Sequence, residues 1–118
     1  MLKVHVKRLN AVEVLSLEGL FVTGNTEILR GAMQLVSGVA EVILDLGNVS
    51  VVDAHGLGVL LQLREQAVAR GVHFELVNVN SSLYRIFEIT RLDTVFNVNR
   101  SIGFVPAFAF AKQMLIAA

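Results

Sequence analysis

The feature that most constrains this chain is the regular change between strand-like and helix-like hydrophobic patterns along its length. Residues 2–9 and 12–17 each alternate apolar and polar side chains on either side of a short turn, which predicts an antiparallel hairpin. After the hairpin, segments with helical spacing alternate with short strand-like segments. Alternation of this kind is typical of βαβ crossovers, so it favours a mostly parallel sheet covered by helices.

Three helices are expected after the hairpin. The first has its apolar positions between residues 28 and 39, with a glycine just past its end. The second is the longest, with a broad apolar arc that begins at Leu57 and a stop at Gly71. The third is short, and either Asn80 or Ser81 can cap its first turn.

Three further strands and one loop lie between and after these helices. They are strands 42–46, 72–77 and 95–98, and a loop over residues 47–53. The predicted fold class is therefore α/β, with one domain spanning residues 1–118. Its sheet has four or five strands and is mostly parallel, with the antiparallel hairpin at the N-terminal edge and helices packed on it.

Composition excludes several classes of function. Ten Lys and Arg balance ten Asp and Glu, and like charges form no run, so a duplex nucleic acid is not an expected partner. The absence of cysteine excludes disulfides, thiolate metal sites and a cysteine nucleophile. An apolar content of 54% is high for a dissolved domain, which indicates that some apolar surface meets a partner.

No targeting or membrane segment is expected, so the predicted location is the cytoplasm. The first residues have charges spaced through them and lack the apolar block of a signal peptide. The most apolar stretch, residues 102–118, is short for a membrane span and is interrupted by Pro106, Lys112 and Gln113.

Motifs that would indicate an enzyme or a metal site are missing. A dinucleotide-binding glycine pattern that starts at Gly56 would need a third glycine where Leu61 stands. His5, His55 and His73 belong to three different elements without ligand spacing, so no metal is expected. No serine-hydrolase elbow or convergent acid–base set occurs. We therefore expect no catalytic residues and no cofactor.

The remaining candidate site runs from residue 48 to residue 58, from the central strand into the longest helix. Asp53 has the position of an N-cap, at a helix end where free N–H groups and the positive dipole end can contact a charged group. Gly56 and Gly58 are expected to let the loop and the first helical turn lie close to another backbone. Capping alone does not explain the histidine at position 55.

These residues resemble the STAS domain family, which includes bacterial anti-sigma factor antagonists and the cytoplasmic tails of sulphate transporters. The resemblance covers nearly the whole chain. It is carried by residues 42–50, the Asp-x-x-Gly-Leu-Gly pattern within 52–60, residues 71–79, and 89–92 before Val95. It implies a non-enzymatic protein-binding domain that regulates transcription by partner switching, in which a kinase-type anti-sigma factor phosphorylates a serine or threonine directly before the Gly-Leu-Gly.

The chain departs from the family at that position. His55 stands at the phospho-acceptor position and Ala54 precedes it, so a serine kinase finds no hydroxyl group there. Ser50, five residues upstream, is a less suitable substitute acceptor, and a phosphohistidine at His55 is chemically feasible. The resemblance therefore implies an antagonist that binds its anti-sigma factor permanently or is controlled by another route.

The predicted contact surface combines this loop with the exposed side of the following helix. Its residues are Asp53, Ala54, His55, Gly56, Leu57, Gly58, Gln62, Glu65 and Gln66. Asp53 would cap and present the loop, and His55 would contact the partner. The alternative partner is the ATPase subunit of a membrane transport complex for lipids or anions, on which the chain would be an accessory STAS subunit. A third hypothesis is a nucleotide sensor at the start of the helix.

The C-terminal segment provides a further hypothesis. Either Ser101 caps a last helix or Pro106 begins it, and it ends near Ala117. Phe108 and Phe110 differ by about 200° in a helix, so they cannot both face one core. We expect this segment either to pack on the sheet or to mediate a homo-oligomer.

Overall fold

The structure is a computed structural model, and it describes residues 1–100 of the 118. The elements in chain order are β1 (Leu2–Leu9), β2 (Val12–Phe21), α1 (Glu27–Gln34), β3 (Glu41–Val52), α2 (Ala54–Ala69), β4 (His73–Val79), α3 (Ser81–Thr90), the 3-10 helix η1 (Leu92–Thr94) and β5 (Asn97–Arg100). The predicted C-terminal helix and its phenylalanines lie outside the described residues.

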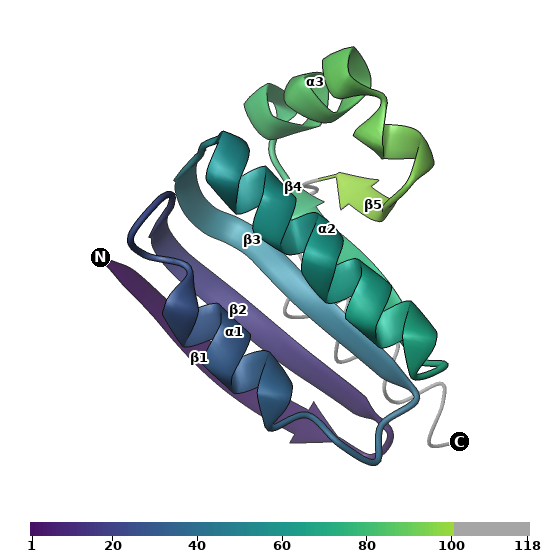
Figure 1. Ribbon diagram of the computed structural model, residues 1–118. Coiled ribbons are helices and arrows are strands. Elements are labelled where there is room, and N and C mark those ends of the chain that lie inside the picture. The colour runs from purple at the N-terminus through teal and green to yellow at the C-terminus, as the bar shows by residue number, and fades with distance from the viewer. Residues whose placement is uncertain (101–118) are drawn as a thin grey trace.

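The five strands form one sheet in the order β1-β2-β3-β4-β5. β1 pairs with β2 antiparallel, and the other three pairs are parallel. After the hairpin every crossover steps in the same direction across the sheet. Right-handed crossovers in one direction place their helices on one face, and Figure 1 shows α1 and α2 lying side by side across that face. The predicted α/β fold class is confirmed.

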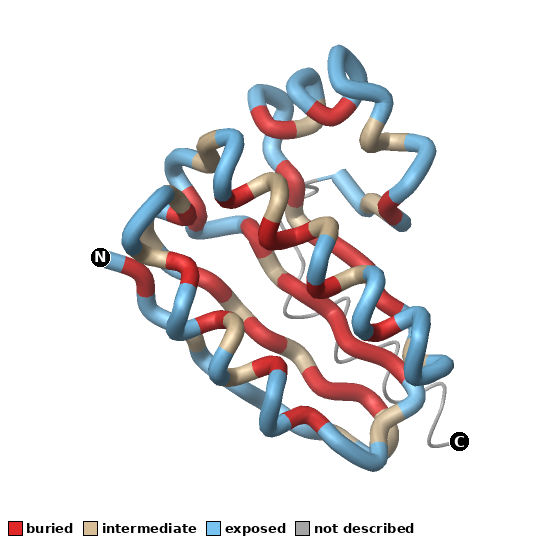
Figure 2. The backbone as a smooth tube through the Cα atoms, viewed as in Figure 1, coloured by how far each residue is buried: buried red, intermediate tan, exposed pale blue. Residues whose placement is uncertain are grey.

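The main core lies between this face of the sheet and the helices. Leu44 and Leu76 on the central strands meet Leu29 of α1, Leu60 of α2 and Phe87 of α3. Figure 2 shows the buried positions running along the strands and along one side of each helix. A second small cluster of Val12, Ile43 and Val77 lies on the opposite face. β3 is therefore buried on both faces over this stretch.

The loop predicted at residues 47–53 is wrong, because β3 continues to Val52. The polar residues in this stretch suggested a loop, but they belong to a strand. That strand pairs with β2, which also continues further than predicted: Gly19 lies opposite Val49 and Phe21 opposite Val52. Two register shifts interrupt that pairing, which explains the broken alternation. β2 therefore runs through Gly19 to Phe21, beyond the predicted end at residue 17. Gly19 has φ +115, and a Cβ there would overlap the carbonyl oxygen of Met1.

Two other boundaries also differ from the prediction. α1 ends at Gln34 instead of near residue 39, because the N–H groups of Leu35 and Val36 donate to carbonyls three residues back and tighten the last turn. β5 covers Asn97–Arg100 instead of residues 95–98. The apolar pair Val95 and Phe96 belongs to the turn after η1, where Phe96 is buried against the ring of Phe87.

Candidate functional site

Asp53 fastens the start of α2 to the end of β2. Its Oδ1 accepts the N–H of Gly56 at 2.8 Å, which confirms it as the N-cap of α2. Its Oδ2 accepts both the backbone N–H and the hydroxyl of Thr23 at 3.0 Å. These hydrogen bonds hold the pKa of Asp53 below its usual value. The bond from the Thr23 N–H has the largest effect, followed by the bond from the Gly56 N–H.

His55 makes a second connection between the same two chain segments. Its Nε2 lies 3.2 Å from the hydroxyl oxygen of Thr26, the N-cap residue of α1. Thr26 is only 2% exposed, whereas His55 is exposed. The imidazole is therefore held on its inner side and presented to solvent on the other. The pairs Thr23–Asp53 and Thr26–His55 hold the first turns of α1 and α2 together.

The two glycines of the Gly-Leu-Gly motif have different surroundings. Gly56 is buried, and a Cβ there would overlap the carbonyl oxygen of Phe21, so α2 can begin against β2 only with glycine at this position. This part of the prediction is confirmed. At Gly58 a Cβ would meet no atom of residues 1–100 within 4 Å beyond its own helix and neighbours. Residues 1–100 therefore contain no backbone that Gly58 lets α2 approach, and for Gly58 the expectation of a close approach to another backbone stays a prediction.

The predicted contact residues extend along α2 from its N-cap to Gln66. Ala54, His55, Gln62, Glu65 and Gln66 are exposed, while Asp53, Leu57 and Gly58 are half-buried. Among these positions only Gly56 is buried, so it supports the site by its packing against β2 and is not part of the exposed surface. The Gln62 side chain accepts a hydrogen bond from the Arg30 guanidinium of α1 at 2.7 Å, which extends the polar surface across both helices.

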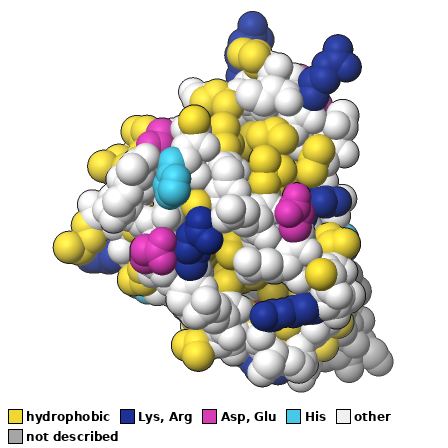
Figure 3. Space-filling model, in the orientation of Figure 1, with side chains coloured by type: hydrophobic (Ala, Val, Ile, Leu, Met, Phe, Trp, Pro, Cys, Tyr) yellow, Lys and Arg dark blue, Asp and Glu magenta, His cyan; other side chains and the backbone are white. Residues whose placement is uncertain are grey.

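An apolar rim lies beside this polar surface. Val51 at the end of β3 and Ile86 of α3 are 50% and 37% exposed. They line a hollow of about 160 Å³ together with Ser50. In Figure 3, hydrophobic side chains gather at the end of this face where Figure 1 places α3 and the start of α2. The exposed Ser50 hydroxyl donates to the Gly19 carbonyl at 3.3 Å.

A larger hollow lies elsewhere. Its volume is about 430 Å³, and it lies between the C-terminal ends of α1 and α2, with Met33, Val36 and Ala67 among its lining residues. It includes Gln66 but neither Asp53 nor His55. This hollow therefore lends no support to the predicted nucleotide site at the start of α2.

Sequence reasoning missed two groupings that join distant parts of the chain. One is the contact of Thr23 and Thr26 with the head of α2; the only available signal was two threonines in the turn before α1. The other is the group Glu41, His73 and Glu75, whose ligand atoms lie within 4.8 Å of one another. Its signal was a histidine and a glutamate two residues apart on a predicted strand.

A family model described as the STAS domain matches residues 3–105 of the chain. The chain belongs to the STAS domain family. Among solved structures, a sulfate transporter family protein from Wolinella succinogenes is 26% identical to this STAS domain, with a TM-score of 0.75, and the match covers 95% of this chain and 93% of that one.

Two anti-sigma factor antagonist structures share the fold. The antagonist from Mycobacterium paratuberculosis is 21% identical over 86% of this STAS domain and 88% of that chain, with a TM-score of 0.76. A putative antagonist from Thermotoga maritima is 20% identical over 94% of both chains, also with a TM-score of 0.76. Within residues 1–100, the helices of this STAS domain lack the length and apolar character needed to cross a membrane.

Proposed function

We propose that this STAS domain is a non-enzymatic regulatory domain, an anti-sigma factor antagonist that binds a kinase-type anti-sigma factor. The proposed contact surface is the loop at Asp53–Gly58 together with Gln62, Glu65 and Gln66. The observation that carries the proposal is the exposed tip formed by Ala54 and His55, which is held in place by the Asp53–Thr23 and His55–Thr26 hydrogen bonds. A tip fixed before binding loses little conformational entropy when it docks.

His55 stands where the family commonly has a hydroxyl residue, and this difference determines how we expect partner binding to be regulated. A serine kinase transfers phosphate to an oxygen, and the positions at the tip, Ala54 and His55, offer none. In a hydroxyl-bearing relative, phosphorylation would add about two negative charges to the contact surface and disrupt docking. This chain would therefore remain competent to bind in the presence of ATP, with Ser50 the substitute acceptor to be tested.

The binding test compares His55→Glu with the wild type by calorimetry against the anti-sigma factor of the same organism. A carboxylate at the contact surface is expected to weaken binding by tenfold or more, which corresponds to about 1.4 kcal/mol. His5→Glu is the matched control, because His5 is an exposed histidine on β1. Equal affinities for wild type and His55→Glu would show that the loop is not the interface.

The regulatory test restores the missing hydroxyl with His55→Ser. In the presence of the kinase and ATP, this variant is expected to take up one phosphate and to release the partner, while the wild type takes up none and stays bound. Mass spectrometry locates the phosphate. Phosphate on Ser50 or His55 of the wild type would contradict the proposal of permanent competence.

The second candidate function is an accessory subunit of a membrane transport complex for lipids or anions. It is favoured by the 26% identity to the sulfate transporter family protein over nearly the full length of both chains. In this case the same surface would dock on an ATPase subunit. Binding to the purified ATPase subunit that His55→Glu weakens, with none to the anti-sigma factor, would select this candidate.

A further inference from the structure

We propose that Glu41, His73 and Glu75 form a binding site for a divalent transition-metal ion, with Zn²⁺ the best match to their chemistry. The three residues lie at the beginnings of two neighbouring parallel strands, Glu41 on β3 and the other two on β4. Glu41 of β3 lies opposite His73 of β4 in the register, and Ile43 lies opposite Glu75. Residues two apart on a strand point to the same side, so His73 and Glu75 share a face with Glu41 beside them.

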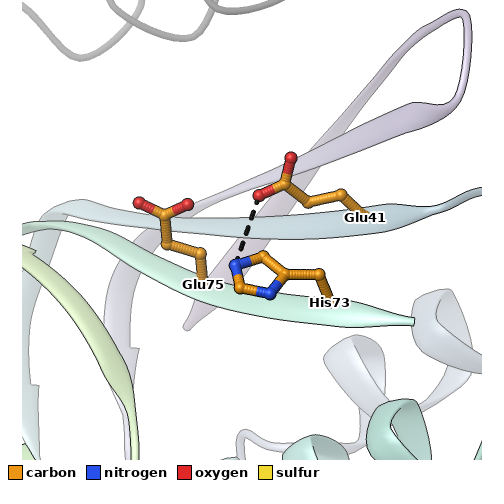
Figure 4. Close-up of side chains that lie close together, drawn as sticks. All are labelled: Glu41, His73 and Glu75. Carbon is orange, nitrogen blue, oxygen red and sulfur yellow. Dashed lines mark ion pairs between the residues drawn. The ribbon is translucent and has the colours of Figure 1, made fainter. Parts of the chain in front are cut away.

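The geometry is close to that of a metal site. The His73 Nε2 lies 3.7 Å from a carboxylate oxygen of Glu41, and one ligand atom from each of the three residues lies within 4.8 Å of the others. Figure 4 shows the three side chains converging between β3 and β4. Two ligands about 2.1 Å from one tetrahedral ion are about 3.4 Å apart, so small side-chain rotations would close the site.

The burial of the two carboxylates distinguishes this group from an ordinary acidic surface. Glu41 and Glu75 are 7% and 6% exposed. Attraction between a divalent cation and carboxylate ligands is stronger at such a buried position than at an exposed one, because the local dielectric is lower. The His73 side chain is 52% exposed, which gives an ion a route from solvent and leaves a fourth coordination position for water.

The surroundings of Glu75 also fit a metal ligand. The Asn99 side-chain amide of β5 donates a hydrogen bond to a Glu75 carboxylate oxygen. Ligating carboxylates are usually oriented by such outer partners. The donor set of one imidazole and two carboxylates suits Zn²⁺, with Mn²⁺ and Fe²⁺ as competitors and Mg²⁺ disfavoured by the nitrogen ligand.

The site lies on the other face of the sheet from α1 and α2. Glu41, His73 and Glu75 alternate with Val42, Phe74 and Leu76, which pack in the core beneath the helices. A metal ion there would leave the Asp53–Gly58 loop uncovered. The metal site and the proposed partner surface are thus independent, and neither test decides the other.

The test is calorimetric titration of the full chain, freed of metal with a chelator, with ZnCl₂, MnCl₂ and MgCl₂. We expect one saturable Zn²⁺ per chain and weaker binding of the other two ions. His73→Ala and Glu75→Gln are each expected to weaken Zn²⁺ binding by at least about tenfold, and Asn99→Ala by about tenfold. Circular dichroism checks that each variant is folded. If Glu75→Gln unfolds, His73→Ala alone tests the site, because replacing an exposed side chain is not expected to unfold the chain.

His5→Ala is the matched control, since His5 is an exposed strand histidine outside the group. It should bind Zn²⁺ as the wild type does. A free Zn²⁺ concentration about one hundred times Kd should raise the wild-type Tm on the order of 10 °C and leave that of His73→Ala nearly unchanged. Absence of saturable binding, equal affinity in His73→Ala, or loss of binding in His5→Ala would each overturn the proposal.

Discussion

Gly58 is a glycine that the described part of the chain does not require. It lies in the second turn of α2, and a Cβ there would meet no atom of residues 1–100 within 4 Å beyond its own helix and neighbours. Glycine within a helix is less stable than alanine by about 1 kcal/mol. The Gly58→Ala variant should therefore raise the free energy of unfolding by about 1 kcal/mol, which corresponds to roughly 4 °C in Tm for a domain of this size.

The same substitution should weaken partner binding. Gly58 lies one turn after Ala54 and one turn before Gln62, on the stripe of α2 that we propose as the contact surface. A methyl group inserted into a packed interface costs about 1–3 kcal/mol, so the expected loss of affinity is about tenfold or more. Greater stability combined with weaker binding would mean that glycine at position 58 is needed for partner binding and not for folding.

Gly31 provides the matched control. It lies within α1, and a Cβ there would also meet no described atom within 4 Å beyond its own helix and neighbours. Gly31→Ala should raise stability by a similar amount without changing affinity. Urea unfolding and calorimetry measure the two quantities separately. A destabilised Gly58→Ala would refute the packing argument, and a stabilised variant with unchanged affinity would refute the role assigned to the glycine.

Three further predictions concern the head of α2 and α3. Gly56→Ala should destabilise the fold by about 1–3 kcal/mol in urea, because the methyl group overlaps the Phe21 carbonyl; a stability equal to that of wild type would contradict this. Since the pKa of Asp53 is lowered by folding, its stabilisation is complete above about pH 4 and is lost as pH falls through the lowered folded pKa. The difference in unfolding free energy between wild type and Asp53→Asn should therefore shrink on acidification. A difference that grows as the pH falls would contradict this prediction. The Asn80 side chain accepts the N–H of Leu83 at 2.8 Å, so Asn80→Ala should lose about 1 kcal/mol in thermal unfolding, and no loss would indicate that Ser81 caps α3 instead.

The topology was predictable because it depends on local periodicity. Each crossover needs only a helix between two strands, and handedness then decides on which face the helix lies. The N-cap role of Asp53 is likewise local, since its partner Gly56 is three residues away. The extension of β3 was not predictable, because Gly47, Asn48 and Ser50 conceal a strand whose pairing with β2 includes two register shifts.

The contacts that define the site were not predictable for a related reason. Thr26 and His55 are separated by 29 residues, and their meeting depends on how α1 and α2 pack side by side. Glu41 and His73 meet through the register of two parallel strands, which the alternation of apolar residues does not specify. The residue types were visible in the sequence, but their partners required the tertiary structure.

The most direct test of the proposed contact surface is an NMR titration of the ¹⁵N-labelled chain with the unlabelled anti-sigma factor. We predict that amide shift changes cluster at residues 53–58 and at Gln62, Glu65 and Gln66, with β1 unchanged. Changes confined to β1 or to the opposite face of the sheet, with residues 53–58 unaffected, would contradict it.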